Sequence, residues 1–207
     1  MEHASIASFG KLALELLSLG APATLVAGAH EAALSEVRHA ELCFALASRY
    51  LDAPVGPGSL PGAAVVRGAQ PLEELAVAAV HEGCVNETIA AALASVQLAA
   101  STDEAVRATL AVIAEDESAH AELAYRVVAW AIKVGGDSVR CSVAGAFHEA
   151  IQKIRLAEVV EPDPEDPDLS ALRAHGRLSP HERQAESGRV IDGVIIPAMR
   201  VLCGNFA

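Results

Sequence analysis

The stretch EVRHAEL at residues 36–42 is repeated as ESAHAEL at residues 117–123, and helical periodicity runs through both copies. In each copy a glutamate precedes a histidine by three residues. Residues at this spacing lie about 60° apart around an α-helix and roughly one turn along it, so each pair is predicted to face one way. One such pair arises readily by chance, but two at equivalent points of a repeat indicate a site. The four residues are Glu36, His39, Glu117 and His120.

Each pair follows a helical segment that carries a further glutamate. Glu2 lies 34 residues before Glu36. Glu82 lies 35 residues before Glu117, so the repeat predicts that Glu2 and Glu82 are counterparts. Glu87 lies about 140° from Glu82 around an α-helix, so only one of the two can face the pairs, and the repeat favours Glu82.

Turn and capping signals around the repeat predict four long helices. Gly20-Ala21-Pro22 ends the first, a loop rich in glycine and proline over residues 52–70 follows the second, and the turn at 101–103 precedes the fourth. The connections are therefore short, long and short. This order predicts two helical hairpins joined by a crossover, which is an all-α four-helix bundle over residues 1–136. The predicted helices cover about residues 2–19, 23–51, 71–100 and 104–135.

The composition agrees with an all-α protein. Hydrophobic residues make up 52% of the 207 residues and aromatic residues only 3%, while alanine recurs throughout. Alanine and leucine favour helices, whereas β-branched and aromatic residues favour strands. The net charge of -12 argues against a nucleic-acid partner, because phosphate binding needs clustered lysine and arginine.

No segment predicts a membrane partner. The most apolar stretches, residues 89–100 and 123–134, are too short to cross a bilayer or contain charges. No basic leader is visible, and the four cysteines form no Cys-x-x-Cys pair, so we expect them to be small buried side chains in a reducing compartment. These features predict a cytoplasmic protein. Because the helical pattern begins at Glu2, two interpretations stay open. Either the natural chain starts upstream of Met1, which leaves an upstream targeting segment open, or Glu2 is a weak ligand in a fraying terminus.

Residues 137–207 are predicted to form a C-terminal helical extension. A fifth helix is expected over residues 137–160, followed by an acidic, proline-rich linker at 161–168 that cannot be helical. A short helical turn ends at Gly176, and a capping box at 179–182 opens a last helix, which Pro197 kinks or ends. We expect this extension to pack against a partner or to form a homo-oligomer.

The glutamate and histidine pattern resembles the ferritin-like di-iron carboxylate superfamily, which includes bacterioferritins, rubrerythrins, acyl desaturases, ribonucleotide reductase small subunits and tRNA-modifying monooxygenases. The resemblance covers residues 2–135 and does not specify the member. It implies two iron ions held inside the bundle, with manganese or mixed metals as alternatives, and imidazole with carboxylate suits these metals. The implied ligands are Glu36 and Glu117 as bridges, Glu2 and His39 on one ion, and Glu82 and His120 on the other.

Three more residues are predicted to lie around these ligands. In several members of the superfamily an aspartate at the position of Asp116 binds a metal-ligating histidine across the bundle, and Ser35 is its weaker counterpart here. Cys43 stands where radical-storing reductase subunits carry tyrosine, which argues against a stored tyrosyl radical. Cys43 is close enough in angle to His39 to approach a metal, but a small core residue is the favoured interpretation. Tyr125 and Trp130 are predicted to be packing residues.

Three functions remain for such a chain. The favoured one is an O₂-activating oxidase or oxygenase that acts on an unknown small substrate or reductant. The alternative is a ferroxidase or iron-handling protein of the ferritin or rubrerythrin type, without a mineral-storage shell. The third is a bundle that binds partners and has lost catalysis. It is disfavoured, because apolar residues in place of buried carboxylates without metal would increase the stability.

Overall fold

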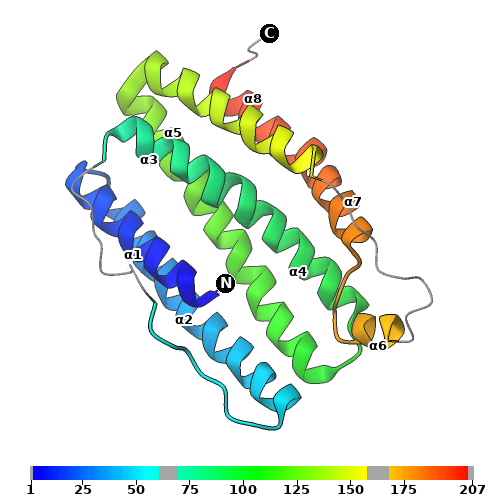
Figure 1. Ribbon diagram of the computed structural model, residues 1–207. Coiled ribbons are helices and arrows are strands. Elements are labelled where there is room, and N and C mark those ends of the chain that lie inside the picture. The colour runs from blue at the N-terminus through cyan, green and yellow to red at the C-terminus, as the bar shows by residue number, and fades with distance from the viewer. Residues whose placement is uncertain (1, 61–69, 158–167, 205–207) are drawn as a thin grey trace. The chain divides into compact units, whose positions relative to one another are not determined.

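The computed structural model describes residues 2–60, 70–157 and 168–204, except for the side chains of Glu2 and Leu169 (Figure 1). Within these ranges every regular element is helical and no strand occurs, which confirms the predicted all-α class. The chain divides into two compact units, residues 1–75 (unit 1) and 76–207 (unit 2). None of the described helices is long and apolar enough to span a membrane.

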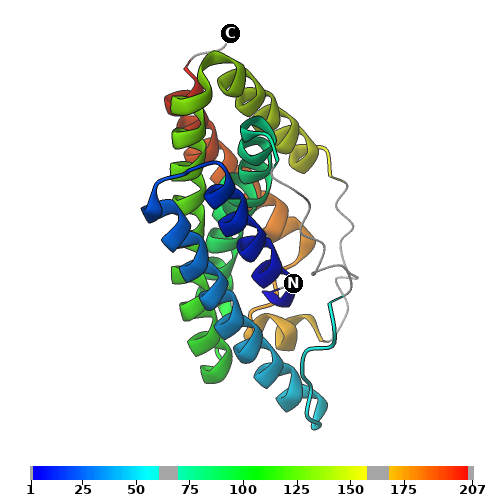
Figure 2. The same cartoon turned by 90° about the vertical axis from the view of Figure 1, so that its left-hand side faces the viewer.

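Unit 1 is a hairpin of α1 (Glu2–Ser18) and α2 (Ala23–Leu51), which lie side by side (Figures 1 and 2). Its turn contains Gly20 at φ 67°, a left-handed conformation that glycine adopts without a steric penalty. The Ala21 N–H then donates to the Leu16 carbonyl over 2.9 Å and closes the end of α1. The helix stop predicted here is confirmed, and residues 52–60 after α2 are not helical, as expected.

The predicted third helix is present as three successive segments. They are α3 (Leu72–Ala78), the π-helix η1 (Ala79–Glu87) and α4 (Thr88–Ala100). The π-helical part differs from the predicted helix, because a uniform α-helical period does not anticipate a wider turn. The helical segment starts in unit 1 at Leu72 and continues through unit 2.

The fourth predicted helix is the first part of α5 (Glu104–Arg155), which packs along η1 and α4 (Figure 1). Asp103 caps its start and accepts a hydrogen bond from the Val106 N–H over 3.0 Å. The backbone leaves helical geometry at Gly136, with φ 68° and ψ -147°. The predicted break between a fourth and a fifth helix is therefore confirmed at Gly136, and the fifth helical stretch ends at Arg155.

The rest of unit 2 is α6 (Leu169–Ala174), α7 (Pro180–Val190), the π-helix η2 (Ile191–Ile195) and α8 (Ile196–Cys203). The predicted capping box is confirmed, since Ser179 and Glu182 each accept the other's backbone N–H, over 3.1 and 2.9 Å. The last helix does not end at Pro197, one of the two expected outcomes, but continues as α8 after the π-helix η2. A proline ring collides with the carbonyl four residues earlier, and a wider turn relieves that collision.

The extension packs within unit 2. α7 lies against α4, and α8 lies beside α5 (Figures 1 and 2). The two compact units divide at residue 75. The predicted division of the chain into a bundle over residues 1–136 and an extension over residues 137–207 stays a prediction. Most of the acidic linker, residues 161–167, lies outside the described residues.

Candidate metal centre

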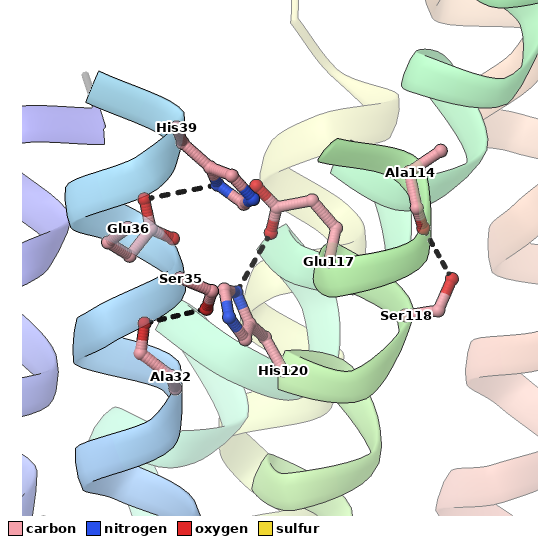
Figure 3. Close-up of polar contacts among 8 residues, drawn as sticks. All are labelled: Ala32, Ser35, Glu36, His39, Ala114, Glu117, Ser118 and His120. Carbon is pink, nitrogen blue, oxygen red and sulfur yellow. Dashed lines mark hydrogen bonds and ion pairs between the residues drawn. The ribbon is translucent and has the colours of Figure 1, made fainter. Parts of the chain in front are cut away.

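In unit 1 the first glutamate–histidine pair lies on the buried face of α2. Glu36 is 1% exposed and His39 is 0% exposed. The His39 Nδ1 atom lies 3.5 Å from the Glu36 Oε2 atom, and both side chains extend from the same side of the helix (Figure 3). Ala32 and Ala29 are buried one and two turns earlier on the same face. The polar pair thus continues a line of small core residues, as the spacing predicted.

In unit 2 the second pair has the same geometry on α5. Glu117 is 5% exposed and His120 is 3% exposed. The His120 Nδ1 atom lies 3.3 Å from the Glu117 Oε2 atom (Figure 3). Ala121 and Ala124 are buried beside the pair and leave room for it, because their side chains are short. The prediction that both members of each pair face one way is confirmed.

A third candidate donor group in unit 2 is Glu87. One carboxylate oxygen of Glu87 lies with the candidate ligand atoms of Glu117 and His120, all within 4.8 Å of one another. Glu82, which the repeat distance favours over Glu87, is exposed. Glu82 as a metal ligand stays a prediction, and Glu87 is the glutamate of η1 that the structure places with these atoms.

The π-helix η1 explains why Glu87, rather than Glu82, lies with these atoms. Its turns close through bonds from residue i to i+5, so each contains about one more residue than an α-helical turn. Both glutamates lie in η1, so angles computed for an α-helix do not apply between them. Gly83 was the available signal, because a glycine inside a helix costs roughly 1 kcal/mol and has to be explained by packing. A Cβ atom added to Gly83 would lie 2.2 Å from the Ala124 Cβ atom, so the helices touch here.

Four more residues were predicted to lie at or around the site, namely Glu2, Ser35, Cys43 and Asp116. Glu2 begins α1, but its side chain is outside the described residues. The Ser35 hydroxyl donates to the Ala32 carbonyl of its own helix over 2.8 Å (Figure 3). Asp116 and Cys43 are half-buried.

The donor set fits a divalent metal ion. Two ligand atoms that each lie about 2.1 Å from one ion, at a right angle, are about 3 Å apart. The Nδ1 to Oε2 distances of 3.3 and 3.5 Å are close to that value, so each pair can bind one ion with a small adjustment. Carboxylate oxygen with imidazole nitrogen suits iron and manganese better than metals that prefer thiolate.

A buried cation would also relieve an electrostatic cost. Two carboxylates, Glu87 and Glu117, lie close together, and like charges at short range repel each other. Burial raises the pKa of the Cys84 thiol in η1 well above its ordinary value. The candidate donor atoms that lie together in unit 2 are carboxylate oxygen and imidazole nitrogen.

These observations define a class: an all-helical protein with a buried carboxylate–imidazole pair at equivalent points of two repeated helices. Comparisons with family models, curated proteins and solved structures find no match for this chain.

Proposed function

We propose that this chain is a ferritin-like di-metal carboxylate protein, in which α1, α2, the η1–α4 segment and α5 form one four-helix bundle. Two buried glutamate–histidine pairs support this proposal, because each has its imidazole Nδ1 beside the carboxylate of its own helix. A four-helix bundle that binds two metal ions places such pairs on two of its helices and a single glutamate on each of the others. Glu87 supplies one of those single glutamates, and Glu2 remains the prediction for the other.

The proposed metals are two iron ions, and the proposed activity is oxidation of a small substrate or reductant with O₂. A bound pair of iron ions supplies redox chemistry with O₂ at such a site. The chain's own part is to hold the ligands in place and to keep water out. The proposed ligands are Glu36 and His39 in unit 1, and Glu87, Glu117 and His120 in unit 2.

Elemental analysis of the purified protein tests the proposal. We expect about two iron or manganese ions per chain. Glu36→Ala and His120→Ala should each lose bound metal, because each removes a buried ligand. Glu41→Ala and Glu122→Ala are matched controls, since these exposed glutamates belong to the same repeated stretches and should leave the metal content unchanged. Metal-free wild-type protein after growth and reconstitution with iron and manganese would contradict the proposal.

Removing the metal is expected to lower the thermal stability. A ligand that binds only the folded state adds about 2.7 kcal/mol at a concentration 100 times its Kd. Thermal unfolding followed by circular dichroism should therefore show a lower Tm after chelation and recovery when Mn²⁺ is returned. The His120→Ala variant should show a much smaller response to both treatments. An equal response in that variant would place the metal elsewhere.

A further inference from the structure

The hydroxyl of Tyr125 binds the π-helix next to the ligands. Tyr125 Oη donates to the Cys84 carbonyl over 3.0 Å. The Thr88 hydroxyl donates to the same carbonyl over 2.7 Å. Cys84 lies inside η1 three residues before Glu87, and Tyr125 lies on α5 five residues after His120. One hydrogen bond thus joins the two ligand-bearing segments of unit 2.

The Tyr125 hydroxyl stays protonated at neutral pH and can donate a hydrogen bond. Burial, only partly offset by the hydrogen bond with Thr88, raises the pKa of Tyr125 to about 12. The proton therefore stays on the oxygen and remains available to the Cys84 carbonyl. A half-buried ring also holds the hydroxyl in one place.

The residues next to Cys84 and Tyr125 are Gly83 and Ala124, and they form a close contact between η1 and α5. Gly83 lies against Ala124, the residue before Tyr125, with no space for a further carbon atom. Close approach at Gly83 and the hydrogen bond at Cys84 therefore act on consecutive residues of η1. Together they fix η1 against α5 in a single register.

The register decides which carboxylate meets the other ligands. If the wide turn closed with α-helical bonds, the residues on one side of it would shift by about one position, or roughly 100° around the axis. Such a rotation would turn the Glu87 carboxylate away from Glu117 and His120. A hydrogen bond that holds the wide turn therefore acts on the site through Glu87.

We propose that Tyr125 is a positioning residue of the metal centre: its hydroxyl bond to the Cys84 carbonyl holds η1 in the π-helical form that presents Glu87 to Glu117 and His120. This inference rests on the proposed function. It assigns Tyr125 a role beyond packing, which was all that the sequence suggested for it.

Titration with Co²⁺, followed by its visible absorption, tests the role of Tyr125. Tyr125→Phe keeps the ring and removes the hydroxyl, and we expect about 10-fold weaker Co²⁺ binding, as is typical when a group that orients a ligand is lost. The absorption band of the bound Co²⁺ should also change toward that of Glu87→Gln, because both variants withdraw the same carboxylate. Amide hydrogen exchange of the metal-free protein should become faster in η1.

Two controls separate positioning from general stability. Tyr50→Phe removes the other tyrosine hydroxyl of the chain, on exposed α2 surface, and should leave Co²⁺ affinity within about twofold. Val139→Ala creates a cavity in the same unit, away from the ligands, and should lower Tm at least as much as Tyr125→Phe without changing the Co²⁺ spectrum.

The outcomes are distinguishable. Wild-type protein that binds no Co²⁺ would overturn the proposed function and this inference together. Wild-type binding with an unchanged Tyr125→Phe variant would overturn the inference and leave the metal centre standing. Weakened binding with an unchanged Co²⁺ spectrum, or equal weakening in Val139→Ala, would also overturn it, since Tyr125 would then act through the fold in general.

Discussion

Glu87→Gln is expected to weaken the binding of Fe²⁺ or Mn²⁺ by more than about 100-fold, whereas Glu82→Gln should change it by less than about twofold. Loss of a group that only orients a ligand already costs roughly 10 to 100-fold in metal affinity, and Glu87 is proposed as a ligand itself. Glutamine has almost the same shape as glutamate but no charge, so packing is preserved while the anionic oxygen is lost. The two substitutions thus differ in position alone.

The contrast between these glutamates is informative because the sequence repeat favours Glu82, whereas the structure places Glu87 with Glu117 and His120. Glu82 and Glu87 both lie in η1, and only Glu87 has an oxygen within 4.8 Å of the ligand atoms of Glu117 and His120. Isothermal titration with Mn²⁺ in the absence of O₂ would measure both variants. If Glu82→Gln lost the metal and Glu87→Gln kept it, the turn would have the α-helical register in solution.

Much of the helical framework follows from local signals in the sequence. The stop at Gly20, the cap at Asp103 and the capping box at Ser179 are each determined by a few neighbouring residues, and the structure has them where expected. The break at Gly136 belongs to the same group, because it needs only a glycine in a left-handed conformation. Such features depend on short-range chemistry, which a single sequence contains in full.

The paired ligands were predictable for a similar reason. Glu36 with His39, and Glu117 with His120, are three residues apart on regular α-helix, so their common direction depends on one well-known angle. Their repetition then separated them from chance matches. Their burial was expected for ligands and is observed for all four side chains.

The position of Glu87 beside Glu117 and His120 could not be predicted, because it depends on packing between helices. The sequence next to Glu82 and Glu87 does not show which of the two faces inward. The orientation of these glutamates depends on η1, where Gly83 lies against Ala124 and Tyr125 donates to the Cys84 carbonyl. Both contacts join residues about 40 positions apart in the sequence. A repeat distance counts residues along the chain, so it does not detect a helical turn that contains one extra residue.

Gly83→Ala is expected to destabilise unit 2 by about 3 kcal/mol or more, although alanine is the better helix former. The added Cβ would lie 2.2 Å from the Ala124 Cβ and 3.5 Å from its Cα, and the first distance is far below any normal carbon–carbon contact. Overpacking a close contact costs roughly 1–3 kcal/mol, occasionally more, and here the obstacle is a short side chain fixed to a helix rather than a flexible one. η1 and α5 have to separate, so the Tyr125 hydrogen bond to Cys84 and the approach of Glu87 should be lost as well.

Gly145→Ala is the matched control for this substitution. Gly145 also lies within a helix of unit 2, but nothing lies within 4 Å of an added Cβ, so alanine should stabilise the protein by about 0.5–1 kcal/mol through helix propensity alone. Urea unfolding of both variants gives the two free energies, and Mn²⁺ titration of the folded fraction shows whether metal affinity falls with Gly83→Ala. A Gly83→Ala protein as stable as wild type would mean that η1 and α5 are farther apart in solution. The close contact between Gly83 and Ala124, which helps to position Glu87, would then be absent.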